Sequence, residues 1–258
     1  MSFVHIWLPA LPVLLLMAIV AWAVATARRN VGLVDIVWSL FFLAALAVYA
    51  TAAGPEGPRA VLLLAIVGVW SLRLSVYLAL RNWNAPEDHR YRAIRARNEP
   101  GFVWKSLYLV FGLQALLAWL ISAPHAGALA STAPPQAFEA LGAALAAFGI
   151  AFESTADAQL SSFKAAPANA GRVMDRGLWR YTRHPNYFGE FCVAWGLWLI
   201  AAGGGAWWTV FAPLLMSFLL LRVSGVALLE KDIGERRPAY RDYIARTNAF
   251  FPGPRRRA

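Results

Sequence analysis

The sequence predicts an all-α, polytopic membrane protein with seven transmembrane helices, and three observations carry that prediction. Hydrophobic side chains make up 59% of the 258 residues and charged ones only 15%, whereas a soluble globular chain is about a quarter charged. Charge-free apolar stretches recur along the chain, and several reach the ~20 residues that a helix needs to cross a bilayer core. The basic residues gather in a few segments between those stretches. This pattern excludes a disordered chain and a soluble two-domain enzyme.

Five apolar stretches predict the first five spans. They are residues 4–27, 36–53, 60–80, 106–122 and 137–163. Arg28 and Arg29 end the first stretch, and a turn-forming run of glycine and proline at 54–58 ends the second. Ala123 and Pro124 are expected to end the fourth span and to begin an uncharged loop.

A longer stretch, residues 191–221, contains no charged residue and is too long for one ordinary span. Three successive glycines at 203–205 offer a break within it, because glycine adopts conformations that end helices. We therefore expect a short sixth helix, followed by a seventh from residue 206 to about residue 229.

The distribution of basic residues predicts the orientation of the chain. Of the 24 lysines and arginines, 21 fall at Arg28 and Arg29, in the loops 81–105 and 164–185, or in the tail 231–258. Among the remaining three, only Arg59 falls on the opposite side. The positive-inside rule then puts the N-terminus outside and the C-terminus in the cytoplasm. The net charge of +10 is therefore explained by the orientation of the chain in the membrane. Nucleic-acid binding is not expected, because no soluble domain offers a basic face.

No internal repeat or linker divides the chain, so residues 1–258 are expected to form a single integral-membrane domain in contact with the lipid bilayer. The single cysteine, Cys192, excludes a disulfide framework and a cysteine-only metal cage. Six tryptophans fall near predicted span ends, as in an interfacial aromatic belt. They are Trp7, Trp22, Trp83, Trp104, Trp207 and Trp208.

Ionisable residues in or beside the predicted spans are candidates for function, because charges are costly within a membrane. They are Asp35, Arg73, Glu153, Asp157, Glu190, Arg222 and Glu230. Glu153 and Asp157 share one helix face, as do Arg73, Tyr77 and Arg81. Both stripes indicate a polar cavity that opens towards the basic side, although buried ion pairs that orient helices are the alternative. The four histidines are scattered, so a metal site is not expected.

The densest polar motif is residues 177–190, with the sequence GLWRYTRHPNYFGE. Pro185 suits the first turn of a helix, and a helix start beside Arg180, Arg183 and His184 is suited to bind phosphate. Glu190, one turn further on, could accept hydrogen bonds from a ribose or an amide. The alternative is an interfacial loop with snorkelling arginines. No Gly-x-Gly-x-x-Gly run occurs, which argues against a Rossmann site.

This motif resembles the C-terminal signature of the steroid 5α-reductase family, in which a tyrosine and a Pro-Asn-Tyr-Phe-Gly-Glu run bind NADPH. Residues 157–164 resemble the acidic-then-basic helix end of that family. A loop of that family has its counterpart here in Glu87-Asp88-His89-Arg90-Tyr91. The cytoplasmic tail of that family has its counterparts in Glu230-Lys231, Tyr240-x-x-Tyr243, Thr247 and Phe250-x-Pro252. The resemblance covers essentially the whole chain, which looks most like a bacterial branch of these reductases. It therefore implies a multi-pass protein of the bacterial inner membrane.

The resemblance implies a seven-helix reductase that binds NADPH on the cytosolic side and acts on a hydrophobic small molecule. The implied cofactor contacts are Asp157, Lys164, Tyr181, Arg183, Asn186, Glu190 and Tyr243, with Arg183 meeting a phosphate. Arg73 and Glu153 are expected to contact the substrate. Lys164 stands where the steroid enzymes have arginine, which weakens a bidentate phosphate clamp. Residues 50–54 lack the Gln-Glu pair with which steroid reductases hold the substrate carbonyl, so steroid specificity does not follow.

The reaction implied is hydride transfer from NADPH to the C=C bond of an enone-type lipid, assisted by a proton donor at the substrate oxygen. Tyr77 is the first candidate donor and Tyr91 the second, with Asp35 as a buried partner or acid. Asp35 also stands at a predicted helix start, where a carboxylate interacts favourably with the helix dipole.

Two other functions stay open. The isoprenylcysteine carboxyl methyltransferases, a related family, share the Arg-His-Pro-x-Tyr-x-Gly core found at 183–189. They use S-adenosylmethionine, tend to have serine after the proline and carry a Glu-Glu pair on the last helix, where this chain has Asn186 and Glu230-Lys231. The third possibility is a non-enzymatic lipid-binding or transport bundle whose polar stripes only hold helices together.

Overall fold

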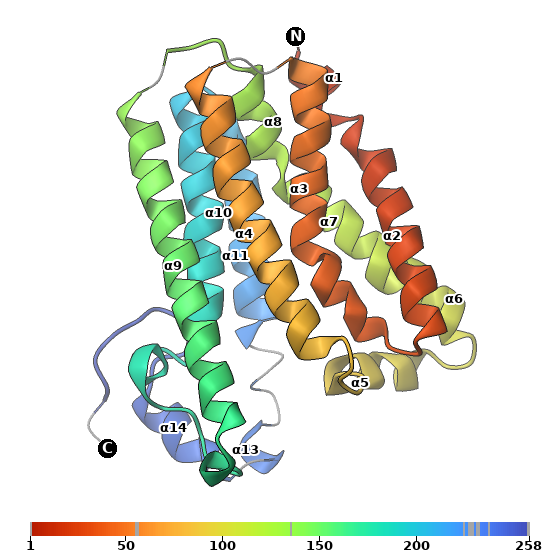
Figure 1. Ribbon diagram of the computed structural model, residues 1–258, viewed down its shortest axis with the longest axis vertical. Coiled ribbons are helices and arrows are strands. Elements are labelled where there is room, and N and C mark those ends of the chain that lie inside the picture. Colours follow the sequence, from red (N-terminus) through yellow and green to blue (C-terminus); the bar gives the residue numbers. More distant parts are fainter. Residues whose placement is uncertain are drawn as a thin grey trace. The chain divides into compact units, whose positions relative to one another are not determined.

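The computed structural model of the protein describes residues 2–54, 57–134, 136–223, 225–226, 230, 233–236 and 238–256. These residues form helices and connecting loops without any strand, which confirms the all-α prediction for the described chain (Figure 1). The chain divides into two compact units. Unit 1 is Met1–Glu139 with Ile200–Thr209, and unit 2 is Ala140–Leu199 with Val210–Ala258. The expectation of a single domain stays a prediction.

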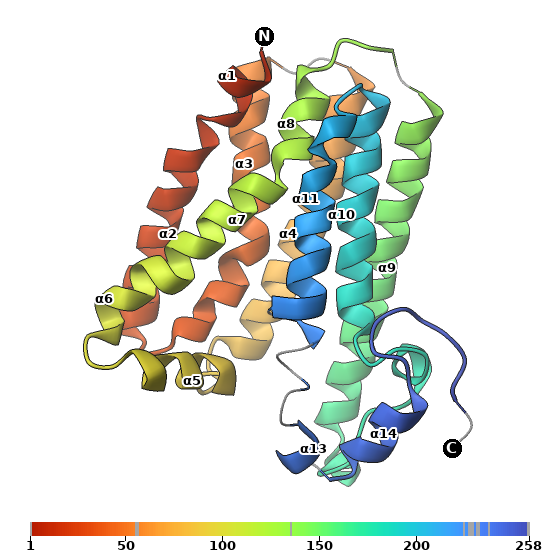
Figure 2. The same cartoon turned by 180° about the vertical axis from the view of Figure 1, so that it is seen from behind.

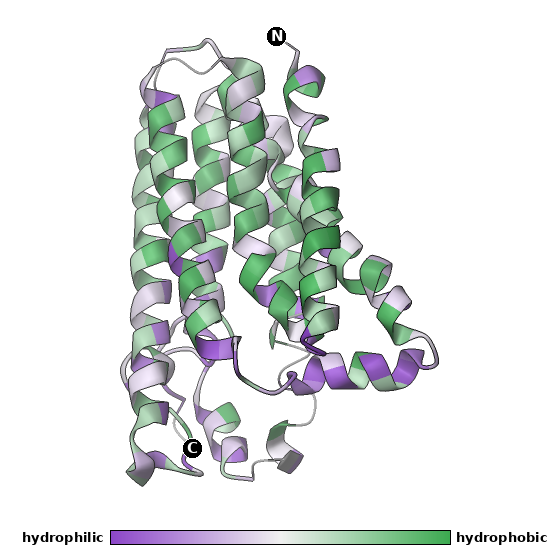
Figure 3. Ribbon diagram, turned by 45° about the vertical axis from the view of Figure 1, so that its right-hand side comes forward, coloured by the Kyte–Doolittle hydropathy of each residue, from purple (hydrophilic) through white to green (hydrophobic). Residues whose placement is uncertain are grey.

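Five helical segments are long and apolar enough to cross a membrane. They are Phe3–Ala27, Val31–Ala53, Pro58–Asn82, Phe102–Leu129 and Ala137–Ala165. Apolar colour runs along most of their length in Figure 3. On α4 (Pro58–Asn82), for example, Leu72, Val76 and Leu80 follow one another at helical spacing and are 53%, 57% and 85% exposed. Such a face is unfavourable in water and suits lipid chains, so the chain has the features of an integral membrane protein.

Unit 1 is organised around α3 (Val34–Ala53), which packs against α2 (Ala10–Ala27), α4 and α7 (Leu113–Ile121) (Figures 1 and 2). Its inward side chains include Phe41, Leu46 and Tyr49, all fully buried. The Tyr49 hydroxyl forms a 2.8 Å hydrogen bond with Ser122 Oγ, so the one polar atom of this side chain is satisfied within the core.

Three contacts of Arg59 brace unit 1 near the start of α4. Arg59 Nη2 lies 2.6 Å from a carboxylate oxygen of Glu139, and the two side chains are only 8% and 6% exposed. The same guanidinium donates to the backbone carbonyls of Ser131 and Ala133 at 3.1 and 2.9 Å. The one basic residue expected opposite the basic segments is therefore neutralised within the protein.

The loop expected at 81–105 contains α5 (His89–Asn98), which the sequence did not predict. Asp88 begins this helix by accepting a 2.9 Å hydrogen bond from the backbone N–H of Arg90. The helix lies across the ends of the longer helices of unit 1 (Figure 1).

The fourth span differs from its predicted bounds. It begins with α6 (Phe102–Ser106), passes through a π-helical stretch (Leu107–Gly112) and α7, and continues as α8 (Ala123–Ala130). The prediction that Ala123 and Pro124 begin a loop is therefore wrong. Pro124 lies in the first turn of α8, where a missing backbone N–H leaves no hydrogen bond unmade.

In unit 2, the antiparallel helices α9 (Ala137–Ala165) and α10 (Pro185–Gly203) approach each other closely through glycines. A Cβ atom at Gly189 would lie 2.6 Å from Glu153 Cβ and 2.7 Å from the Gly149 carbonyl oxygen. One at Gly196 would lie 2.6 Å from the Ala146 nitrogen. Only glycine allows the two backbones to pack at this distance.

The predicted break at 203–205 is confirmed, because α10 ends at Gly203 and Gly205 has a φ of +91°. However, α10 begins at Pro185, six residues before the uncharged stretch. The next apolar segment runs over Trp207–Val223 and includes α11 (Phe211–Phe218). The end predicted for the seventh span, at about residue 229, lies outside the described residues. Neither segment is among the five counted above, so the sixth and seventh spans stay a prediction.

Candidate active site

The first part of the polar motif, residues 177–184, forms a loop that docks on α9 before α10 begins at Pro185. Gly177 has a φ of +55°, which favours glycine. The backbone N–H of Leu178 then donates to the Gln159 side-chain oxygen at 2.9 Å. Trp179 is buried, and its indole N–H donates to the Ala156 carbonyl at 3.0 Å. These contacts fix the loop on α9 next to Asp157.

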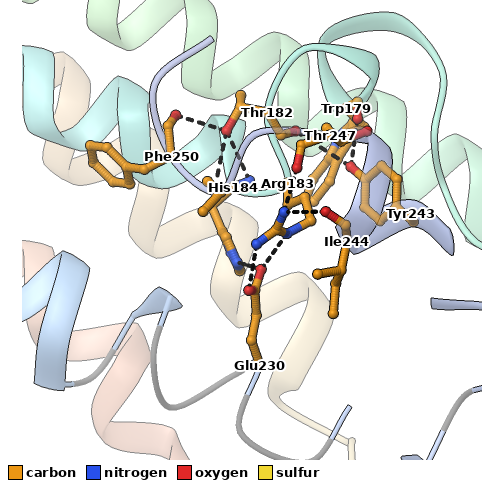
Figure 4. Close-up of polar contacts among 10 residues, drawn as sticks. Trp179, Thr182, Arg183, His184, Glu230, Tyr243, Ile244, Thr247 and Phe250 are labelled. Atoms are coloured by element: carbon orange, nitrogen blue, oxygen red, sulfur yellow. Dashed lines mark hydrogen bonds and ion pairs between the residues drawn. The ribbon is translucent and has the colours of Figure 1, made fainter. Parts of the chain in front are cut away.

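A cluster of charged side chains ties this loop to Glu230 (Figure 4). Arg183 Nε and Nη2 donate to the two carboxylate oxygens of Glu230, both at 2.7 Å. Arg183 Nη1 donates to the backbone carbonyls of Ile244, at 3.1 Å, and Thr247. His184 Nε2 lies 2.9 Å from Glu230. The guanidinium, 7% exposed, is thus engaged on three sides by the protein itself.

Further contacts extend this connection to α14 (Tyr240–Arg246) and the tail. The buried Tyr243 hydroxyl donates to the Trp179 carbonyl, and burial raises the pKa of Tyr243 so that the hydroxyl keeps its proton. Thr182 Oγ1 donates to the Phe250 carbonyl at 2.7 Å. We call Arg183, His184, Glu230 and Tyr243 the tail anchor, because they hold the loop and the tail together.

The electrostatics of the tail anchor favour an ionised Glu230. Burial opposes ionisation, but the hydrogen bonds and positive charge of His184 and Arg183 outweigh it and lower the pKa of Glu230 to about 2. Glu230 therefore carries a full negative charge at neutral pH, opposite the guanidinium that it binds bidentately.

Three carboxylic acids of unit 2 are buried: Glu153 and Asp157 on α9 and Glu190 on α10 are 2%, 3% and 8% exposed. Glu153 lies against Gly189 in the close α9–α10 contact, Glu190 is the next residue of α10, and Asp157 follows Glu153 by about one turn of α9. We call these three residues the buried acids. Each makes at least one polar or electrostatic contact within the protein. Burying three carboxyl groups is costly unless they have such partners.

Exposed basic side chains are found at the end of α9 and on the segment between α9 and α10. Lys164, Arg172, Arg176 and Arg180 are all exposed, as is Tyr181, while Asn186 at the second position of α10 is half-buried. Unit 2 therefore combines a buried acidic set with an exposed basic one. Arg183 and Tyr243, also predicted as cofactor contacts, belong to the tail anchor, where their polar atoms are engaged by the protein. Their contact with a cofactor stays a prediction.

A second polar group lies in unit 1, where Tyr91 of α5 meets the start of α3. The Tyr91 hydroxyl donates to one carboxylate oxygen of Asp35, and Arg90 Nη2 binds the other at 3.0 Å. Gln114 Nε2 of α7 approaches the Tyr91 oxygen at 3.5 Å. Burial, and then the charge of Asp35, raise the pKa of Tyr91 well above 10.0. We call these four residues the Tyr91 cluster.

The structure brings together two of the three predicted catalytic residues, Asp35 and Tyr91. The third, Tyr77, lies half-buried on α4, with the Arg81 guanidinium 5.3 Å from its ring centre. This contact confirms the shared face expected for Tyr77 and Arg81. Arg73, predicted to contact the substrate, is half-buried on the same helix. Within the described chain, no group of three or more His, Cys, Asp or Glu side chains could hold a metal ion.

Sequence reasoning missed Gln114 and the partners of Arg183. Gln114 is the one side-chain amide in the stretch 106–122, and a lone amide in an apolar span is a signal that could have identified it. Arg90 lies in the Glu87–Tyr91 run that resembles the reductase family, but its pairing with Asp35 joins positions 55 residues apart and depends on the tertiary fold. The pairing of Arg183 with Glu230 joins positions 47 residues apart and depends on the tertiary fold.

A protein-family model described as "Protein of unknown function (DUF1295)" matches residues 21–247. The match covers far more than half of the chain. The protein belongs to the DUF1295 family. No curated protein and no solved structure matches the chain. The DUF1295 match includes the Tyr91 cluster, the buried acids and the tail anchor, so all three groups lie within the region that defines the family.

Proposed function

We propose that the protein is a membrane reductase that binds NADPH and transfers a hydride to the C=C bond of an enone-type lipid or steroid-like substrate. The observation that carries this proposal is the combination, in unit 2, of three buried carboxyl groups on α9 and α10 with four exposed bases at the end of α9 and on the segment that follows it. A binding site with both sets suits a ligand that offers hydrogen-bond donors at one end and phosphates at the other.

The residues present fit a nicotinamide dinucleotide by their chemistry. Carboxylates such as Asp157 and Glu190 accept hydrogen bonds from amide and ribose groups. Exposed Lys164 and Arg180 can meet phosphates as charge-assisted donors. Asn186 is partly accessible and offers both a donor and an acceptor. Arg183 and Tyr243 are assigned to hold the loop in place. When bound, NADPH would supply the hydride.

The remaining requirement of the reaction is a proton for the substrate oxygen, and Tyr91 is our preferred donor in place of Tyr77. Its hydroxyl is buried, keeps its proton over the physiological range, and is already oriented by Asp35 and Gln114. A hydroxyl held in this way can turn to a substrate oxygen without losing all its partners, which limits the cost of desolvation.

We further propose seven spans with an outside N-terminus, a cytoplasmic C-terminus and a location in the bacterial inner membrane. The concentration of basic residues in the predicted cytosolic segments supports this orientation. The ion pair of Arg59 with Glu139 supports it as well, because it neutralises the one basic residue expected on the outer side.

The test is cofactor binding to the purified full-length protein by isothermal titration calorimetry. We expect saturable binding of NADPH and a loss of about tenfold or more in affinity for Asp157→Asn and Asn186→Ala, since a hydrogen bond to a charged group contributes ~1.5–3 kcal/mol. Glu235→Gln, which removes an exposed carboxylate of the tail, is the matched control and should bind as the wild type does. Saturable binding of S-adenosylmethionine instead of NADPH would favour a methyltransferase. Binding of neither would favour a non-enzymatic membrane protein.

A further inference from the structure

Helix α5 offers a charged surface that the proposed reaction does not use. Its side chains divide into two faces. Tyr91, Ile94, Arg95 and Asn98 recur at intervals of three and four and are buried or half-buried, so they form the inner face. The outer face consists of Arg92, Ala93, Ala96 and Arg97, all exposed.

The basic residues of α5 have different partners. Arg90 is bound by Asp35 and Asp88, each at 3.0 Å. Arg95 Nη2 lies 2.8 Å from Glu87. Asp35, Asp88 and Glu87 thus form their ion pairs with Arg90 and Arg95, while Arg92 has only a charge interaction with Glu87. Arg92 and Arg97 supply the positive charge of the outer face.

The position of α5 along the chain indicates its depth relative to the bilayer. It connects two of the apolar helices that can cross a membrane, Pro58–Asn82 and Phe102–Leu129. Trp83 follows the first directly and Trp104 lies in the first turn of the second, and they are 44% and 68% exposed. Exposed tryptophans at helix ends mark the headgroup layer of a bilayer. A short helix between two such markers lies at the level of the headgroups.

We infer that the outer face of α5 binds the headgroups of anionic phospholipids in the leaflet where α4 ends. The outer face has the features that this partner requires. Its two arginines are five residues apart and lie at the two edges of the exposed face. Arginine suits bidentate contact with phosphate. The alanines between them leave room for a headgroup to approach the backbone. No large apolar side chain lies on this face, so the interaction is electrostatic adsorption rather than insertion.

The proposal can be tested by native mass spectrometry of the full-length protein, titrated with phosphatidylglycerol or with phosphatidylcholine of the same acyl chains. Wild-type protein should prefer phosphatidylglycerol, and Arg92→Gln/Arg97→Gln should reduce that preference by about fivefold per arginine. Arg92→Lys/Arg97→Lys, which keeps the charge, should retain most of it. The matched control Arg172→Gln/Arg176→Gln removes two equally exposed arginines from unit 2 and should behave as the wild type.

Several outcomes would overturn the inference. One is an unchanged lipid preference in the Arg92/Arg97 glutamine variant, with its thermal unfolding showing that it is folded. Another is an equal loss in the Arg172/Arg176 control, which would mean that net charge alone sets the preference. A third is full displacement of the lipid by an equal concentration of soluble glycerol phosphate, because the face would then be a site for soluble anions.

Discussion

Removing the carboxylate of Glu230 is expected to release the tail from the loop that precedes α10. The substitution Glu230→Gln keeps the size of the side chain but replaces three charge-assisted contacts, two from Arg183 at 2.7 Å and one with His184 at 2.9 Å. Arg183 is 7% exposed, so the variant leaves a guanidinium with little access to water and without its counter-ion.

Two estimates of the cost agree. Breaking a buried ion pair by removing one partner costs ~3–5 kcal/mol. The lowering of the pKa of Glu230 from 4.5 to about 2 corresponds to ~3 kcal/mol of stabilisation. Since the Glu230 side chain keeps 15% of its surface exposed, we take the lower end and expect a loss of ~2–3 kcal/mol after allowing for solvent.

The assay is thermal unfolding of the full-length protein in detergent, followed by the fluorescence of its tryptophans. A loss of ~2–3 kcal/mol should lower the midpoint by ~5–10 °C for a chain of this size. The double variant Glu230→Gln/Arg183→Gln should be less destabilised than the sum of the single variants, because the pair is removed together. Glu235→Gln, an exposed glutamate, is the control. Equal midpoints for wild type and Glu230→Gln, or strict additivity, would refute the role assigned to the anchor.

The same ion pair predicts a pH dependence. The pKa of Glu230 is lower in the folded protein than its ordinary 4.5, so its contribution is fully present above that value and is lost as the pH falls towards 2. The difference in midpoint between wild type and Glu230→Gln should therefore shrink over this window. A difference that stays constant from neutral pH to about pH 3 would contradict the assigned charge state.

Three further changes test other parts of the structure. Gly189→Ala should destabilise the protein by ~1–3 kcal/mol because the new methyl group has no room between α9 and α10, whereas Gly68→Ala, where nothing lies within 4 Å, should be neutral or slightly stabilising in thermal unfolding. Arg59→Gln should cost ~3 kcal/mol, measured in the same way, by leaving Glu139 buried without its partner. Tyr91→Phe should leave NADPH binding unchanged and slow NADPH oxidation with a lipid enone by about 100-fold or more.

Each of these has a result that would count against it. Equal effects of the two glycine substitutions would mean that the α9–α10 contact is looser than described. An Arg59→Gln variant as stable as the wild type would mean that the pair with Glu139 contributes nothing. A Tyr91→Phe variant that oxidises NADPH at the wild-type rate would return the role of proton donor to Tyr77.

Much of the fold follows from the sequence because the lipid bilayer restricts which segments of a chain can span it. A span needs a long apolar stretch, and the first five stretches were sufficient to predict five helices. The glycines at 203–205 likewise marked a real helix end. The continuation past Pro124 was missed because proline is compatible with the first turn of a helix, so its presence alone does not decide between a loop and a new helix. α5 was missed because its inner face is polar and has no apolar periodicity.

The sequence predicted several residues of the candidate site, but not which of them contact one another. Asp35 and Tyr91 could each be selected, yet their contact depends on how α5 folds back on α3. Arg183 was selected as a phosphate ligand because a basic residue before a helix start has that chemistry. Its actual partner, Glu230, also carries a charge that the sequence displays, but local spacing cannot show which of several opposite charges two distant segments bring together.

The central claim is that unit 2 binds NADPH, and calorimetric titration of the purified full-length protein tests it most directly. The account predicts saturable binding of NADPH that weakens by about tenfold or more in Asp157→Asn, whose buried carboxylate is neutralised without loss of shape. Absence of NADPH binding by the folded wild-type protein, or affinity unchanged in both Asp157→Asn and Asn186→Ala, would contradict it.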